Sequence, residues 1–173
     1  MFSFTIGHLI DFVALLMLYI FVFFPRWKRK GKGIVFIRTV MYIYLSFVLF
    51  FTMMPIITSL PHVIDHPYAF NLIPFDDYVN GRGDFMRQII LNVIMTVPFG
   101  FLFPLTQSRK KRSLMMTVLM TFLLSLLIEV LQPIVNGDRS FDVTDLITNT
   151  LGGAIGYLGY VVIRPILGFN RNG

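Results

Sequence analysis

The chain alternates long apolar stretches with short polar segments, and five of the stretches are long enough to cross a membrane as helices. One helical crossing needs roughly 20 predominantly apolar residues. The predicted spans are residues 5–24, 33–57, 89–105, 114–131 and 146–167. The pattern therefore predicts an all-α integral membrane protein in which about five transmembrane helices form one bundle.

Prolines modify two of these predicted helices. The third stretch is short and contains Pro98, Gly100 and Pro104, so we expect a kinked or tilted helix. Pro98 and Gly100 would either line a cavity or pack against a neighbouring helix. In the fourth stretch, Pro133 directly follows Gln132 and is expected to end the helix there.

Composition separates this chain from soluble enzymes. Of its 173 residues, 55% are apolar and only 14% are charged, whereas soluble domains carry roughly 25% charged residues. We expect a single membrane domain over residues 1–173. The absence of cysteine excludes a disulfide framework, a thiolate nucleophile and a Cys-based metal centre. No Lys or Arg precedes the first apolar stretch, so a cleaved signal peptide is not expected.

The basic residues predict the orientation of the bundle. Segments 25–38 and 106–113 and the C-terminal end hold twelve of the 15 Lys and Arg residues, all on one side of the predicted spans. The opposite side has only Arg82, Arg87 and Arg139. Because basic loops stay in the cytoplasm, we predict that the N-terminus is outside and the C-terminus inside. The basic clusters indicate topology and contact with anionic lipid rather than a nucleic-acid partner.

Strongly polar residues within or next to the predicted spans all fall toward the outer side in this orientation. They are His8, Asp11, Asn92, Ser125, Glu129, Gln132, Asp142, Asp145 and Asn149. An acid at the centre of a membrane helix costs about 2.5–3.5 kcal/mol on insertion scales. Such residues therefore indicate either a polar site or hydrogen bonds between helices.

Helical periodicity places these residues on two faces. Ser125, Glu129 and Gln132 share a face of the fourth helix by i, i+4 and i+7 spacing. The fifth helix is expected to carry a second face, made by Asp142, Asp145, Asn149, Gly153 and Gly156. The pair Gly152 and Gly156 would let a neighbouring backbone approach closely. The two helices are predicted to be antiparallel neighbours whose polar faces can meet.

Arg139 lies between these helices and is the expected partner of Glu129, Asp142 and Asp145. One arginine cannot pair with three acids, so one acid would remain spare or share a proton. One interpretation is a polar cavity at the outer leaflet that holds a lipid headgroup or a lipid-attached substrate. The other is that Glu129, Asn92 and Asn149 only form hydrogen bonds between helices.

The outer segment 58–88 adds two features. His62, Asp65 and His66 have a spacing that could bind a metal on a helix, but Pro61 and Pro67 flank them closely. We therefore expect no metal ion and no cofactor. Residues 68–78 are rich in aromatic side chains and are expected to lie at the level of the lipid headgroups.

Several motifs, taken in order, resemble the VanZ-like family of integral membrane proteins. They are Asn71-Leu-Ile-Pro-Phe75, Asn92 with Val97-Pro-Phe-Gly100, Ser125-x-x-x-Glu129-x-x-Gln132, Gly137-x-Arg139-x-Phe-Asp142-x-x-Asp145, and Asn149-Thr-x-Gly-Gly153-x-x-Gly156. The resemblance covers residues 71–160, about half of the chain. It implies a role at the cell envelope, because the family is named for a factor that lowers susceptibility to teicoplanin.

Three hypotheses follow from the residues and the resemblance together. The first is a non-enzymatic factor whose polar site binds a lipid headgroup, a lipid-linked wall precursor or an acylated glycopeptide. The second is a membrane enzyme that modifies a lipid headgroup or a lipid-linked envelope component, with Glu129 or Asp145 as general base and Arg139 holding phosphate or carboxylate. The third is a structural or interaction protein. The expected ligand-binding residues are Asn71, Asn92, Ser125, Glu129, Gln132, Arg139, Asp142, Asp145 and Asn149, with Glu129 as the central one.

Overall fold

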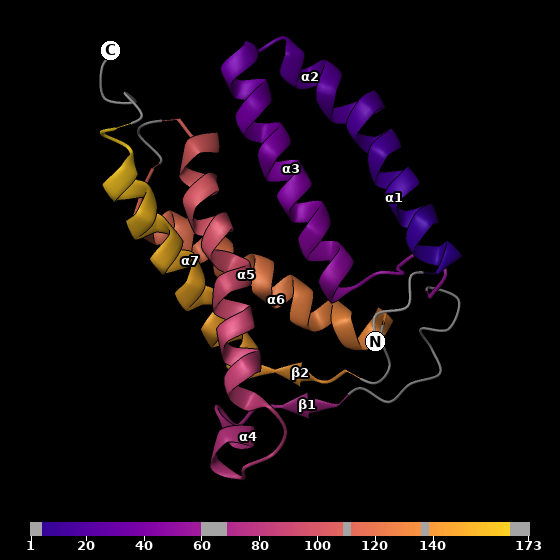
Figure 1. Ribbon diagram of the computed structural model, residues 1–173, viewed down its shortest axis with the longest axis vertical. Helices are drawn as coiled ribbons and strands as arrows, with labels where there is room; N and C mark the ends of the chain where they lie inside the picture. Colours follow the sequence, from indigo (N-terminus) through magenta and orange to yellow (C-terminus); the bar gives the residue numbers. More distant parts are fainter. Residues whose placement is uncertain (1–4, 60–68, 109–111, 136–138, 167–173) are drawn as a thin grey trace. The chain divides into compact units, whose positions relative to one another are not determined.

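The computed structural model describes residues 5–59, 69–108, 112–135 and 139–166 (Figure 1). The described residues contain five helices that are long and apolar enough to cross a membrane. These spans are Ile6–Lys28, Lys32–Thr52, Phe85–Thr106, Leu114–Val135 and Val143–Ile163. The prediction of an all-α chain with five candidate membrane helices is confirmed.

The first span is continuous but has three parts, namely α1 (Ile6–Leu18), a π-helical turn η1 (Tyr19–Phe23) and α2 (Phe24–Lys28). The other spans are α3 (Lys32–Thr52), α5 (Phe85–Thr106), α6 (Leu114–Val135) and α7 (Val143–Ile163). Three short elements complete the described structure: β1 (Phe70–Asn71), α4 (Asp76–Val79) and β2 (Phe141–Asp142). The strands β1 and β2 pair as a two-stranded sheet.

The burial pattern is the reverse of that in a water-soluble protein. Large apolar side chains such as Phe21, Leu158 and Val162 are more than half exposed on the long helices. The most deeply buried side chains are instead mainly polar, among them Thr96, Thr117, Thr121, Ser125, Glu129 and Asn149. Exposed apolar surface on this scale is stable in lipid rather than in water, so the fold is that of a multi-pass membrane protein.

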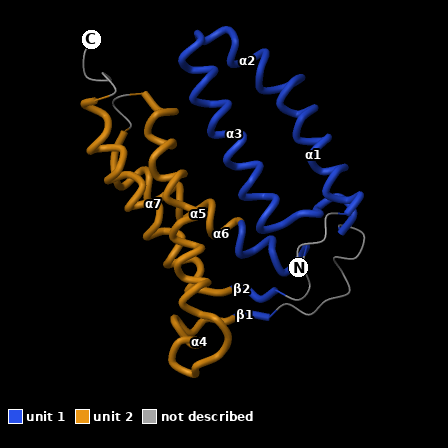
Figure 2. Tube along the Cα trace, in the orientation of Figure 1, with its two compact units in different colours: residues 1–70, 128–141 blue, residues 71–127, 142–173 orange. Residues whose placement is uncertain are grey.

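The chain divides into two compact units (Figure 2). Unit 1 comprises residues 1–70 and 128–141, and unit 2 comprises residues 71–127 and 142–173. Helix α6 therefore contributes its first part to unit 2 and its last turns to unit 1.

In unit 1, the first span and α3 lie side by side (Figure 1). The Tyr42 hydroxyl donates to the carbonyl of Leu15 at 2.7 Å, and the hydroxyls of Tyr19 and Thr39 are 2.8 Å apart. Around these bonds, the rings of Tyr19, Phe23, Trp27 and Tyr42 pack with centroid separations of 5.2–6.4 Å. Aromatic packing supplies contact area where the exclusion of water cannot drive association.

The predicted second span is too long at its C-terminal end. Helix α3 ends at Thr52, five residues before the predicted end at residue 57. A residue that precedes proline avoids helical backbone angles, and Pro55 follows Met54 here. The segment after α3 instead contacts Asp11, whose carboxylate accepts hydrogen bonds from the backbone N–H groups of Ile56 and Ile57 at 2.5 and 3.1 Å.

In unit 2, glycines allow α5 and α7 to pack backbone against backbone. A Cβ atom added to Gly156 would lie 2.0 Å from the carbonyl oxygen of Val97, and one added to Gly100 would lie 2.0 Å from that of Gly153. A Cβ on Gly152 would likewise meet Val93 and Thr96. The predicted close approach at Gly152 and Gly156 is therefore confirmed, and Gly100 serves the packing of α5.

The predicted ends of two other helices are wrong. Helix α6 continues through Pro133 to Val135, because a proline in the last turn removes only the bond from its own nitrogen to the carbonyl four residues earlier. Helix α7 begins at Val143, and Asp142 precedes it in extended conformation as the N-cap. Asp142 therefore does not lie on a continuous helical face with Asp145 and Asn149.

Candidate functional site

The N-terminus of α7 fixes the first part of the site. The carboxylate of Asp142 accepts a hydrogen bond from the backbone N–H of Thr144 at 2.7 Å, which satisfies one of the free donors of the first turn. The same carboxylate accepts from the side-chain amide of Asn71 at 3.1 Å. The Asn71 segment is thereby held at the start of α7.

A second hydrogen bond joins the loop that precedes α4 to the first turn of α7. The backbone N–H of Phe75 donates to the hydroxyl of Thr144 at 2.9 Å. Phe75 has a φ of 59°, in the left-handed region, which costs roughly 1–2 kcal/mol for a residue with a side chain. The bond to Thr144 helps to hold this conformation, after which α4 begins at Asp76.

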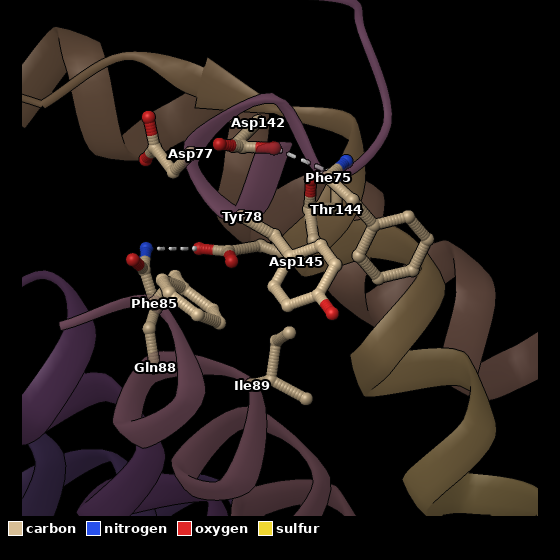
Figure 3. A pocket seen from close by; sticks show the side chains of 9 residues that line it. All are labelled: Phe75, Asp77, Tyr78, Phe85, Gln88, Ile89, Asp142, Thr144 and Asp145. Carbon is tan, nitrogen blue, oxygen red and sulfur yellow. Dashed lines mark hydrogen bonds between the residues drawn. The ribbon is translucent and has the colours of Figure 1, made fainter. Parts of the chain in front are cut away.

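These contacts leave an open pocket between α4, the first turns of α5 and the start of α7 (Figure 3). About 270 Å³ of empty space lies between and in front of its walls, and this figure includes the open solvent at its mouth. We call it the acid pocket. Its lining residues are Phe75, Asp77, Tyr78, Phe85, Gln88, Ile89, Asp142, Thr144 and Asp145.

Carboxylates and aromatic rings dominate this lining. Asp77, Asp142 and Asp145 supply three acids, and none of the nine lining residues is Lys, Arg or His. Asp145 is the most enclosed acid, since only 8% of the residue is exposed. Its carboxylate accepts from the side-chain amide of Gln88 at 3.3 Å (Figure 3).

A second polar layer lies one helical turn further along α5 and α7. Asn149 follows Asp145 by four residues, and its side-chain amide donates to the hydroxyl of Ser125 at 2.9 Å. The Thr96 hydroxyl donates to the backbone carbonyl of Asn149 at 2.7 Å. The contacts of Ser125 with Asn149 and of Thr121 with Gly153 confirm that α6 and α7 are antiparallel neighbours in unit 2.

Two buried polar atoms of this layer have no hydrogen-bond partner among the described residues. They are the side-chain nitrogen of Asn92 and the side-chain oxygen of Asn149. An unsatisfied buried donor or acceptor costs about 1–3 kcal/mol. The layer can therefore take up one further acceptor and one further donor.

Unit 1 holds the remaining predicted site residues. Glu129 and Gln132 are buried, with exposed fractions of 2% and 7%. Gln132 donates its side-chain amide to the carbonyl of Thr52 at 3.2 Å, which joins the end of α6 to the end of α3. Arg139 is exposed.

An ion pair lies close to the acid pocket, at the start of α4. Arg82 and Asp76 form an ion pair at 2.8 Å. The pairing of Arg139 with the acids stays a prediction.

Similarity to known proteins assigns the family. Residues 12–164 match the VanZ/LLP1 family. The chain belongs to the VanZ/LLP1 family. It is also similar to Protein VanZ of Enterococcus faecium, with 36% identity over 91 residues, which are 53% of this chain and 52% of that protein. The match thus spans about half the length of this relative, and no solved structure matches the chain.

The VanZ/LLP1 match confirms the family resemblance and extends it. The motifs indicated residues 71–160, whereas the family match begins at residue 12 and includes most of the first span and the whole second span. Unit 2 holds six predicted site residues, namely Asn71, Asn92, Ser125, Asp142, Asp145 and Asn149. Their role in binding a ligand, like that of Glu129, Gln132 and Arg139 in unit 1, stays a prediction. His62, Asp65 and His66 lie outside the described residues.

Sequence reasoning missed several residues that line the acid pocket, chiefly Asp77, Phe85, Gln88 and Thr144. Helical periodicity could have identified Gln88, because it precedes Asn92 by four residues and therefore lies on the same helical face as this predicted site residue. The position of Asp77 depends on the folding of the loop before α4, which helical periodicity does not report.

Proposed function

We propose that this VanZ/LLP1-family protein acts at the outer leaflet of the cell membrane. Its acid pocket would hold the polar group of a lipid-level envelope ligand, either a membrane lipid, a lipid-linked wall precursor or an acylated glycopeptide. Through that binding, the protein would lower susceptibility to teicoplanin more than to vancomycin. In this proposal the protein is a binding factor rather than an enzyme.

The observation that carries the proposal is the acid pocket at the starts of α5 and α7. Three acids line one opening beside long helices with exposed apolar sides. Burying acids only to join helices is expensive, since amide side chains can form the same bonds without a charge. Family membership supports the link to teicoplanin.

The orientation can be tested by cysteine labelling, because the natural chain has no cysteine. Val79 in α4 and Ser108 after α5 are exposed and lie near opposite ends of α5. We expect a membrane-impermeant maleimide to label Val79→Cys in intact cells and Ser108→Cys only after permeabilisation. Labelling in the opposite pattern would place the acid pocket on the cytoplasmic side and contradict the proposal.

Drug selectivity tests the function itself. A sensitive Gram-positive host that expresses the chain should need more teicoplanin for inhibition than the same host with an empty vector. The vancomycin requirement should change little, because vancomycin lacks the lipid tail that would bring a drug to the outer leaflet. Equal protection against both drugs, or no protection from correctly inserted protein, would contradict the proposed function.

A further inference from the structure

Positive charge gathers at the end of unit 2 that lies away from the acid pocket. At this end α5 and α7 stop, and Arg112 lies just before α6 while Arg164 follows α7. The sequence has no Asp or Glu in residues 85–127 or 146–173, so every acid of unit 2 belongs to the end that holds the acid pocket. No carboxylate side chain of unit 2 therefore offsets the charge of these arginines.

Hydrogen bonds hold Arg112 against the last turns of α7. Its guanidinium donates to the backbone carbonyl of Gln107 at 3.1 Å and to the hydroxyl of Tyr160 at 3.5 Å. The hydroxyl of Tyr157 donates to the backbone carbonyl of Arg112 at 3.5 Å. Tyr157, Tyr160 and Arg164 are spaced by three and four residues, so they share one face of the helix. Arg164 therefore lies one turn beyond Tyr160, on the face of α7 that Arg112 contacts.

The guanidinium of Arg164 has a donor that the described residues leave unused. Its Nε atom is buried and has no hydrogen-bond partner among them. Arginine stays protonated in proteins, so this N–H group needs an acceptor from elsewhere. The Nε–H and a terminal N–H of one guanidinium can bind two oxygens of the same phosphate group. The unused donor therefore indicates an anionic oxygen ligand.

Apolar side chains near Arg164 indicate that this anion is attached to a lipid. Val162 and Ile166 lie within two residues of it and are 70% and 81% exposed. At the start of α6, Met115 is 81% exposed as well. Apolar surface of this kind is stable against acyl chains. A phospholipid carries its phosphate where its acyl chains begin, so one molecule can meet both the arginine and the apolar side chains.

We propose that Arg164, with the charge of Arg112 beside it, binds the phosphate of an anionic membrane phospholipid. The sequence indicates only a general contact of basic segments with anionic lipid, whereas here one guanidinium with an unused donor defines the binding group. The site lies at the opposite end of α7 from the acid pocket and goes beyond the proposed function. In the orientation predicted from the basic residues, it faces the cytoplasmic leaflet, whose anionic lipids attract such arginines.

Thermal unfolding of the purified full chain in a neutral detergent tests this site. Phosphatidylglycerol, phosphatidylcholine or inorganic phosphate is added in increasing amounts at equal ionic strength. A ligand that binds only the folded state raises the melting temperature with its concentration. We expect phosphatidylglycerol to raise it most, phosphatidylcholine less because choline offsets the phosphate charge, and inorganic phosphate not at all because it has no acyl chains. Equal stabilisation by both lipids, or by inorganic phosphate, would contradict recognition of an anionic lipid.

Three variants locate the binding. Arg164→Gln removes the charge and the donor pair and should weaken phosphatidylglycerol binding by about tenfold or more, as expected for loss of a charge-assisted hydrogen bond. Arg164→Lys keeps the charge but not the bidentate contact, so its affinity should be intermediate. Arg29→Gln removes an exposed arginine at the end of α2 in unit 1 and should leave the affinity nearly unchanged. Full binding by Arg164→Gln, or an equal loss in Arg29→Gln, would overturn the inference.

Folding and drug protection are measured separately from lipid binding. The melting temperature without lipid shows whether each variant is folded, and Arg164→Lys decides the result if Arg164→Gln is not. If the natural chain protects selectively against teicoplanin but shows no preference for phosphatidylglycerol, this inference alone fails. If phosphatidylglycerol binds through Arg164 but the chain gives no protection, only the proposed function fails.

Discussion

Replacing Gly156 by alanine is expected to destabilise unit 2 strongly, because α5 and α7 pack at their backbones there. The added Cβ would lie 2.0 Å from the Val97 carbonyl oxygen and 2.9 Å from the Gly100 Cα, and neither atom belongs to a flexible side chain. Overpacking of this kind costs about 1–3 kcal/mol and occasionally more. At roughly 2–4 °C per kcal/mol for a chain of this size, a cost of about 3 kcal/mol lowers the melting temperature by roughly 6–12 °C.

A neighbouring glycine on the same helix provides the control. A Cβ on Gly159 would meet only a side-chain atom of Phe101, at an ordinary contact distance of 3.8 Å. Gly159→Ala should therefore leave the melting temperature in detergent nearly unchanged or raise it slightly, since alanine favours helix. Similar destabilisation by both variants would show that helix propensity or expression, and not the α5–α7 contact, sets the result.

The second large effect is expected for Asp11→Ala in unit 1. Asp11 is 3% exposed, and its carboxylate accepts from the backbone N–H groups of Ile56 and Ile57. Its removal leaves two donors of the segment after α3 without their acceptor. Hydrogen bonds to charged groups contribute about 1.5–3 kcal/mol each, so we expect a loss of about 3–5 kcal/mol.

Two comparisons make the Asp11 result interpretable. Asp11→Asn keeps one acceptor oxygen and should lose less stability than Asp11→Ala in the same thermal unfolding measurement. Asp84→Ala removes an exposed acid at the N-cap position of α5, where its side chain makes no capping hydrogen bond, and should change stability by no more than about 0.5 kcal/mol. If Asp11→Ala unfolds at the same temperature as the natural chain, the carboxylate does not hold the segment after α3.

The sequence predicted the membrane helices well because hydrophobic length is a strong signal in lipid. It was less accurate at helix ends, because single residues such as prolines decide where a helix stops. Pro133 lies inside α6 rather than after it, and Pro55 marks an earlier end of α3 than hydrophobicity alone suggested. Apolar composition continues beyond Thr52, but the backbone turns to satisfy the buried charge of Asp11.

The candidate site was only partly predictable, for a different physical reason. The glycines and polar residues of α7 repeat at helical spacing, so their shared face could be read from periodicity. The acid pocket also depends on the left-handed backbone of Phe75 and its bond to Thr144. Such tertiary contacts of a loop leave no periodic pattern, which is why Asp77 was not selected.

The central claim is that the acid pocket, and not merely the folded bundle, carries the protective function. Its most direct test is the teicoplanin concentration that inhibits host cells expressing the natural chain, Asp145→Asn or Asp84→Asn, with each protein quantified in the membrane. At equal abundance, we predict that Asp145→Asn loses most of the protection and that Asp84→Asn retains it. Full protection by Asp145→Asn would contradict the claim and direct attention to Glu129 in unit 1.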